Sequence, residues 1–329
     1  MSNLPLFDDR KIGNLSREVL SQKLSSLADE GIYIGTSSWK YEGWLGQIYT
    51  HERYQVRGRF SRKKFEQTCL AEYAETFPVV GGDFSFYQFP TADYWGRLFD
   101  GAPERLKFAL KVPEEITVQV WPRHARCGPR AGARNPSFLD AELFGSGFAG
   151  ALEPYHDRVA VLMFEFGAFP HASYPEGVEQ FAADLNPFLR QLPQKFRYAV
   201  EVRNPEFLQP PYFDCLKANN TAHVFSSWSR MPSLAEQSAI PEAFTLDFSV
   251  CRALLRPGRS YAEAVRRFSP YAGVLDPYPE GRDALRSLLE KSRKDRKSAF
   301  IFVNNRFEGN APESIAAVIC GQIETLHQP

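Results

Sequence analysis

Short runs of apolar residues recur along the chain, each followed by a turn-rich segment and usually by a segment with helical periodicity. Ranges such as Phe181–Leu192 and Ala284–Lys291 repeat their apolar residues every three to four positions, which indicates amphipathic helices. The apolar runs are predicted strands: Gly31–Thr36, Val79–Phe86, Leu106–Val112, Val159–Phe164, Phe196–Val202, Thr221–Ser226, Ala243–Phe248 and Ala299–Val303. Eight strands that alternate with helices predict an α/β protein with a closed parallel sheet, a TIM-type (β/α)8 barrel. The alternative is an open doubly wound sheet, but no glycine-rich phosphate-binding turn follows the first run.

Two of the connections between these strands are too long to be plain helices. The segments Pro113–Gly150 and Arg252–Ser298 are rich in turn-forming residues, and the strand–helix alternation resumes after each of them. They are therefore predicted to be insertions after strands three and seven within one domain, rather than linkers between domains.

A helix is predicted ahead of the first strand. The segment Ser16–Glu30 places Leu20, Leu24 and Leu27 on one helical face, and Ser16 is a plausible N-cap. We therefore divide the chain into a helical extension, residues 1–30, and a single barrel domain, residues 31–329, with the helix closing the N-terminal end of the barrel.

Composition narrows the class of protein. Hydrophobic residues make up 43% of the chain, enough for a large core, and Lys+Arg equal Asp+Glu at 39 each, so no global charge points to nucleic acid or membrane. The five cysteines are scattered and form no CxxC pair, which argues against a disulfide framework and a zinc site. No secretory signal begins the sequence and no apolar stretch has the length of a membrane helix, so we expect a cytoplasmic protein without a membrane partner.

Five segments resemble the YecE-like family, domain of unknown function 72, in the order that the family has them. They are GTSSWKYEGWLGQIY (Gly35–Tyr49), FSFYQFP (Phe84–Pro90), LKFALKVPEEIT (Leu106–Thr117), AVEVRNPEF (Ala199–Phe207) and FVNNRFEGNAP (Phe302–Pro312). The resemblance spans nearly the whole chain beyond Gly31. It implies a TIM-type barrel, in agreement with the strand pattern, and it implies no particular activity.

The chain departs from the family pattern on three strands. Family members usually carry Glu then Asn in strand two, Gln-Phe-Pro at the end of strand four, and an Arg followed by His-Gly in strand seven. The corresponding residues here are Gly81 and Asp83, Glu165-Phe166-Gly167, and Asp247-Phe248-Ser249. A ligand site shared within the family is therefore expected to be altered in this divergent member.

Alternation along the strands predicts which side chains enter the barrel. Active sites of TIM barrels lie at the C-terminal ends of the strands, and side chains there alternate between the interior and the helix layer. Polar residues fall on the inward positions late in several strands, and the inward charged set is Lys111, Glu165, Glu201, Arg203 and Asp247. These residues are predicted to surround a ligand, with Glu201, Glu165 and Lys111 as catalytic candidates. The alternative is an ion network that pairs internally and only fills the barrel.

Metal binding and nucleophilic catalysis are less well supported by the sequence. Glu165, Glu201 and Asp247 offer carboxylates to a divalent cation, but no histidine ends a strand on the inward side and the neighbouring cations compete. We therefore expect no metal and no cofactor. No GxSxG elbow and no Cys–His arrangement is present.

The predicted loops at the C-terminal ends of the strands carry more Lys and Arg than Asp and Glu, and all five tryptophans lie in or beside them. A cationic, tryptophan-rich rim suits an anionic, phosphate-bearing small molecule. The ligand-binding candidates are Trp39, Tyr87, Arg203, Asn204, Asp247, Asn304 and Asn305. The alternatives are a nucleic-acid-binding or nuclease-like protein that uses the arginine-rich loops one, three and seven, and a non-catalytic scaffold. The sequence leaves open whether the protein is an enzyme.

Overall fold

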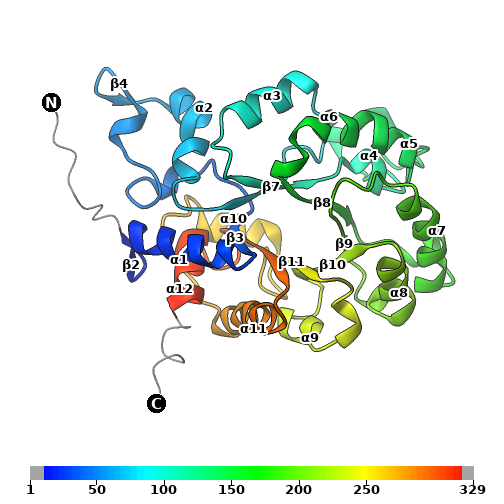
Figure 1. Ribbon diagram of the computed structural model, residues 1–329. Helices are drawn as coiled ribbons and strands as arrows, with labels where there is room; N and C mark the ends of the chain where they lie inside the picture. Colours follow the sequence, from blue (N-terminus) through cyan, green and yellow to red (C-terminus); the bar gives the residue numbers. More distant parts are fainter. Residues whose placement is uncertain (1–10, 321–329) are drawn as a thin grey trace, which may run out of the picture.

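The computed structural model describes residues 11–320, and its centre is a closed barrel of eight parallel strands surrounded by helices (Figure 1). In chain order the barrel strands are β3 (Ile32–Thr36), β6 (Val79–Gly82), β7 (Lys107–Lys111), β8 (Val159–Phe166), β9 (Tyr198–Val202), β10 (Thr221–Ser227), β11 (Phe248–Ala253) and β12 (Ser298–Val303). Each strand pairs with its neighbours in the chain, and β12 pairs with β3 to close the sheet. The predicted TIM-type barrel is confirmed.

The helices form the outer layer. The longer ones are α1 (Arg17–Asp29), α2 (Arg62–Tyr73), α3 (Ala92–Asp100), α7 (Val178–Arg190), α8 (Pro210–Ala218), α10 (Tyr261–Phe268), α11 (Pro279–Asp295) and α12 (Ala311–Cys320). Short helices are α4 (Glu114–Thr117), α5 (Ala141–Phe144), α6 (Gly150–Leu152) and α9 (Leu234–Ser238). The predicted insertions after strands three and seven are present, and they hold α4 to α6 and α10 to α11. The connection after β3 carries a further addition that the pattern did not indicate, the hairpin β4 (Gln55–Val56) and β5 (Arg59–Phe60).

The seventh strand was predicted in the wrong place. The segment Ala243–Phe248 was expected to be a strand because its apolar residues alternate, but the strand begins at Phe248. Instead, Ala243 ends a short 3-10 helix, and the Thr245 hydroxyl donates to the carbonyl oxygen of Thr221 at 2.9 Å. The true strand has Arg252 at an inward position. This charge interrupts the apolar run that is typical of a buried strand.

The barrel interior is filled in layers. Tyr33 stacks on Phe300 with ring centroids 5.3 Å apart near the N-terminal end, and alternating residues such as Ala109, Val161 and Ala199 fill the space above. This confirms the predicted inward parity of β3, β7, β8 and β9. Apolar side chains occupy the lower and middle layers, and charged side chains begin only near the C-terminal ends of the strands.

The seam between β3 and β6 differs from the rest of the barrel. A single pair of residues, Thr36 and Val80, is in register there. Tyr73 of α2 supplies the missing hydrogen bonds, because its hydroxyl accepts from the Thr36 amide at 3.0 Å and donates to the Val79 carbonyl oxygen at 2.9 Å. A Cβ atom at Gly35 would lie 1.9 Å from the same carbonyl oxygen, so the close approach of the two strands requires glycine.

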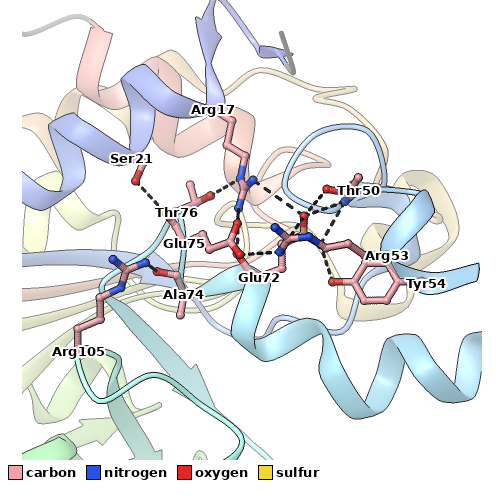
Figure 2. A network of polar contacts seen from close by, with 10 residues as sticks. All are labelled: Arg17, Ser21, Thr50, Arg53, Tyr54, Glu72, Ala74, Glu75, Thr76 and Arg105. Atoms are coloured by element: carbon pink, nitrogen blue, oxygen red, sulfur yellow. Dashed lines mark hydrogen bonds and ion pairs between the residues drawn. The ribbon is translucent and has the colours of Figure 1, made fainter. Parts of the chain in front are cut away.

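Helix α1 is joined to the barrel by both apolar and ionic contacts. Ser16 caps it by accepting from the Val19 amide, as predicted, and Leu20 and Leu24 are fully buried. Burial of such a leucine contributes roughly 1.5–3 kcal/mol. Arg17 donates to Thr76 at 2.9 Å and to Glu75 at 2.7 Å, which ties the helix to the segment before β6 (Figure 2). Helix α1 therefore lies at the N-terminal end of the barrel, where the sequence placed it.

Candidate functional site

Six charged side chains from five strands or their ends, the adjacent β6 to β9 and β11, converge inside the barrel near its C-terminal mouth. The cations are Lys111, Arg203 and Arg252, and the anions are Asp83, Glu165 and Glu201. Glu201 is fully buried, and Asp83 is the most open of the six, with 44% of its side chain exposed. The three positive and three negative charges balance, and we call this group the ion network.

Arg252 of β11 is the centre of the ion network. One of its terminal nitrogens lies 2.6 Å from Glu165 and also contacts Glu201, while the other lies 3.1 Å from Asp83. Its guanidinium therefore connects three acids from β8, β9 and the end of β6. Charges taken out of water are expensive unless they are paired in this way.

The remaining two cations complete the ion network. Lys111 lies 3.1 Å from Glu165, and Arg203 lies 3.0 Å from Glu165 and 2.6 Å from Glu201. Arg203 also stacks on the Trp228 ring at 3.9 Å, and the Ser226 hydroxyl donates to Glu201 at 2.6 Å. The predicted residues Lys111, Glu165, Glu201 and Arg203 are thus together, and their charges are largely satisfied by one another.

The surrounding cations keep Glu165 ionised. Burial by itself would raise the pKa of this carboxyl, but the charges of Arg203, Lys111 and Arg252 outweigh burial and hold its pKa well below the ordinary value. The same contacts raise the pKa of Arg252 against the effect of burial. Glu165 is therefore a carboxylate at neutral pH in this arrangement.

The ion network should make stability depend on pH in the acid range. A carboxyl whose pKa is lowered by folding stabilises the protein above its unfolded pKa, and this stabilisation is lost as the pH falls through the folded pKa. We expect the part of the free energy of unfolding that Glu165 contributes to be lost below about pH 4.5. For Glu165→Gln the decline should be shallower, although the variant is less stable at neutral pH. Urea unfolding between pH 7 and pH 3 measures both, and parallel curves for the two proteins would contradict the assignment.

A cleft of about 290 Å³ opens beside the ion network, above the seam between β3 and β6. Its walls come from the ends of β3, β6 and β12 and from α3 and α10, and its lining residues are Ser37, Ser38, Trp39, Lys40, Tyr41, Gly81, Asp83, Phe84, Tyr94, Tyr261, Asn304 and Arg306. Asp83 belongs both to this cleft and to the ion network, so the two features share one wall.

Lys40 and Arg306 line the cleft without a carboxylate partner within residues 11–320. The Arg306 guanidinium lies 4.5 Å from the centre of the Tyr261 ring, and its buried Nε has no hydrogen-bond acceptor among the described residues. The Ser37 hydroxyl is also buried without a partner in the described part of the chain. Burial raises the pKa of Tyr41 more than the Arg306 charge lowers it, so the phenol remains a donor. The cleft therefore offers unused donors and uncompensated positive charge.

The structure brings only some of the predicted ligand-binding residues to the cleft. Trp39 and Asn304 line it, and the buried Trp39 ring meets Phe84 edge-on at 5.6 Å. Asn204 is bound to the backbone of Phe169 through both its oxygen and its nitrogen, at 2.7 and 3.1 Å, which is a structural role.

Two further candidates also lie outside the cleft lining. Tyr87 is 64% exposed, and the Arg126 guanidinium lies 5.0 Å from the centre of its ring. Asn305 accepts a hydrogen bond from the Ala311 amide at the start of α12 at 2.8 Å.

The prediction for Asp247 was wrong. Asp247 precedes β11 and is exposed at the N-terminal end of the barrel, because the strand starts at Phe248, the residue at which the predicted strand ended. The inward charge on this strand is Arg252, which sequence reasoning missed. The alternation of Phe248, Val250 and Arg252 carried the signal, once the strand is placed correctly.

Within residues 11–320, no group of three or more His, Cys, Asp or Glu side chains is arranged to hold a metal ion. The three acids of the ion network each contact a cation instead. In the same part of the chain, no helix combines the length and apolar character needed to cross a membrane.

Comparison with known proteins identifies the family. Residues 33–322 match the family described as "Protein of unknown function DUF72". The chain belongs to the DUF72 family. It is also 24% identical over 176 residues to the UPF0759 protein YecE of Escherichia coli strain K12, and it is equally similar to YecE of Escherichia coli O157:H7. These matches cover 54% of this chain and 50% of YecE, so the chain spans about half the length of the curated relatives that it matches.

Solved DUF72 structures share the fold. A DUF72 family protein from Enterococcus faecalis V583 superposes with a TM-score of 0.57 at 16% identity, covering 91% of this chain and 97% of that chain. A second DUF72 family protein, from Thermotoga maritima MSB8, gives a TM-score of 0.55 at 17% identity, covering 90% and 99%. The resemblance found in the sequence is therefore confirmed for the family and for the barrel.

Proposed function

We propose that this protein binds a small anionic molecule, of the phosphate-bearing kind, in the cleft at the C-terminal end of the barrel. The observation that carries the proposal is the pair of cations Lys40 and Arg306, which line the cleft and have no carboxylate partner among residues 11–320. A confined, partly desolvated site strengthens such charges relative to an exposed surface. TIM barrels place their ligand sites at this end.

The cations that would hold the anion differ from the candidates that the sequence indicated. Lys111, a catalytic candidate, and Arg203, a ligand-binding candidate, are already neutralised by Glu165 and Glu201. In the proposal, Arg306 grips the anion through its guanidinium donors, and Lys40 adds a point charge.

The remaining polar and aromatic residues of the cleft would complete the site. Ser37 and Tyr41 add hydroxyl donors. Asn304 also lines the cleft, and because its amide oxygen already accepts from the Arg306 amide at 2.9 Å, it would offer its amide nitrogen as a donor. Trp39 and Tyr261 provide aromatic walls for the rest of the ligand.

The catalytic roles of Glu201, Glu165 and Lys111 remain predictions. Of the three acids in the ion network, Asp83 is the one that lines the cleft, so a proton leaving a bound ligand would meet Asp83 before it met Glu165 or Glu201. The other acids would act through Arg252, by fixing the position of Asp83.

Calorimetric titration tests the proposal. Native protein at low salt should bind at least one ligand from a panel of phosphate, sugar phosphates and mononucleotides. For Arg306→Gln we expect affinity for that ligand to fall at least tenfold, because a charged hydrogen bond contributes about 1.5–3 kcal/mol. Lys40→Gln should weaken binding by a smaller factor, since its ammonium is a single, more mobile charge.

The matched control is Arg266→Gln, which removes an exposed arginine of α10 that has no ion pair within the described residues. It should bind as the native protein does. Native protein that binds none of the panel, or Arg306→Gln that binds as tightly as native, would refute the proposal.

A further inference from the structure

The hairpin β4–β5 stands at the edge of the molecule beside α2 (Figure 1). Its two strands pair antiparallel, with Gln55 opposite Phe60 and Val56 opposite Arg59. The turn consists of Arg57 (φ 54°) and Gly58 (φ 75°), both in the left-handed region, as the tightest hairpins require. Asn or Gly adopts this left-handed backbone more easily than arginine does. The tip nevertheless carries the positive charge of Arg57.

Positive charge is concentrated on this hairpin and on the residues beside it. Residues 53–64 contain six Lys or Arg and no Asp or Glu. Arg53 and Arg62 are paired, at 2.5 Å from Glu75 and 3.0 Å from Glu66 respectively. The other four are exposed and have no carboxylate partner within the described range: Arg57, Arg59, Lys63 and Lys64.

Other basic loops of the barrel neutralise much of their own charge. In the connection after β7, Arg126 pairs with Glu114, and Arg130 lies 2.9 Å from Glu115. In the connection after β11, Arg259 pairs with Asp276. The hairpin segment differs because residues 53–64 contain no acidic residue. Four of its cations have no carboxylate partner among residues 11–320 and are therefore available to an external anion.

Apolar side chains are exposed among these cations. Val56 is 51% exposed and Phe60 is 40% exposed, although both lie on a hairpin that is otherwise polar. The Phe60 ring packs against Phe65 of α2, and the two ring centroids are 6.0 Å apart. This contact holds the orientation of the Phe60 ring. A fixed, exposed ring between arginines is a stacking platform for a nucleobase.

The base of the hairpin is attached to the barrel. Tyr54 is buried, its hydroxyl donates to Glu72 at 2.6 Å (Figure 2), and its carbonyl oxygen accepts from the Ser61 amide at 2.7 Å. Lys64 donates to the carbonyl oxygen of Gln55 at 3.3 Å. The arm is therefore preorganised, and binding to it would require little further ordering.

We propose that the hairpin β4–β5 is a contact surface for single-stranded nucleic acid. Arg57, Arg59 and Lys63 would contact successive phosphates, and Phe60 would stack on a base. The repeated negative charge of a nucleic-acid strand matches four unpaired cations along one arm better than a small anion does. None of these residues lines the cleft of the proposed function, so the two proposals stand separately.

Fluorescence anisotropy with a labelled single-stranded DNA of mixed sequence tests this proposal across a range of salt concentrations. Native protein should bind, with an affinity that falls as salt rises. The triple variant Arg57→Asn/Arg59→Gln/Lys63→Gln should lose roughly tenfold or more in affinity, and its salt slope should be shallower by about 2, since each phosphate contact contributes about 0.7. Asn is used at position 57 because it tolerates the left-handed backbone. Phe60→Ala should lower affinity about fivefold or more without changing the slope.

The control triple variant Lys217→Gln/Arg266→Gln/Lys294→Gln removes three exposed cations from other helices and should bind DNA as native does. Arg306→Gln should also leave DNA binding unchanged while it weakens small-anion binding, which separates failure of this proposal from failure of the cleft proposal. No binding at low salt, an equal loss in the control variant, or equally tight binding to a blunt duplex would overturn the inference.

Discussion

Replacing Arg252 with methionine is expected to lower the free energy of unfolding by about 3–5 kcal/mol, because it leaves buried carboxylates without their shared partner. In the native protein this side chain is 3% exposed and contacts Asp83, Glu165 and Glu201. For a chain of this size the change corresponds to a melting temperature lowered by roughly 4–7 °C. Urea unfolding and thermal unfolding followed by circular dichroism measure it.

Two comparisons isolate the ionic contribution. The double variant Arg252→Met/Glu201→Gln restores the balance of charge in the ion network, so its loss should be smaller than the sum of the two single losses by at least 1 kcal/mol. Arg266→Met removes an exposed arginine and should change stability by less than about 0.5 kcal/mol. A loss below 1 kcal/mol for Arg252→Met would show that the ion network is not a structural requirement.

Native protein is expected to lose stability steeply between pH 6.5 and pH 4 because of His223. Burial lowers the pKa of this imidazole to about 3, and its ring is enclosed by Tyr212, Phe213 and Phe225. In the unfolded chain the same group titrates near 6.5, so below that pH the unfolded state binds a proton that the folded state excludes. The resulting loss approaches 1.4 kcal/mol for each pH unit and stops near the folded pKa.

The variant His223→Leu should flatten this part of the stability curve, although it is less stable at pH 7 because the hydrogen bond between Tyr212 and Nδ1, 3.1 Å in the native protein, is lost. His171→Gln, which changes an exposed histidine, should leave the curve as it is in the native protein. Urea unfolding at half-unit steps of pH gives the slopes, and identical slopes for native protein and His223→Leu would rule out this explanation.

The parts of the fold that follow local rules were predictable. Period-two alternation placed Lys111, Glu165 and Glu201 inside the barrel without knowledge of their neighbours. The same rule failed at Ala243–Phe248, where an alternating loop precedes the true strand. A charged residue such as Arg252 is compatible with a buried strand only when acids from other strands meet it, and this information is not local.

The candidate site was less predictable than the barrel. Trp39 and Asn304 were identified because they follow strands. Lys40, one residue after Trp39, and Arg306, two residues after Asn304, were not identified. Whether a cation is available to a ligand depends on whether it forms an ion pair with a carboxylate. Ion pairing in turn depends on contacts between loops that are far apart in the sequence. Arg203, a ligand-binding candidate from the sequence, is neutralised by Glu165 of β8 and by Glu201 of β9, the strand that Arg203 itself follows.

The bond that Tyr73 makes across the β3–β6 seam has a mechanical consequence for the cleft. The other strand pairs of the barrel have three or more residues in register, whereas β3 and β6 are joined by the single pair Thr36–Val80 and by the hydrogen bonds of the Tyr73 hydroxyl to Thr36 and Val79. The sheet therefore has its fewest interstrand pairs there, and the cleft, with Ser37 on one side and Gly81 on the other, lies over this seam. If the cleft binds an anion as proposed, a change in its width would therefore separate the pair of strands with the fewest interstrand bonds, and would leave the ion network on β7, β8, β9 and β11 in place.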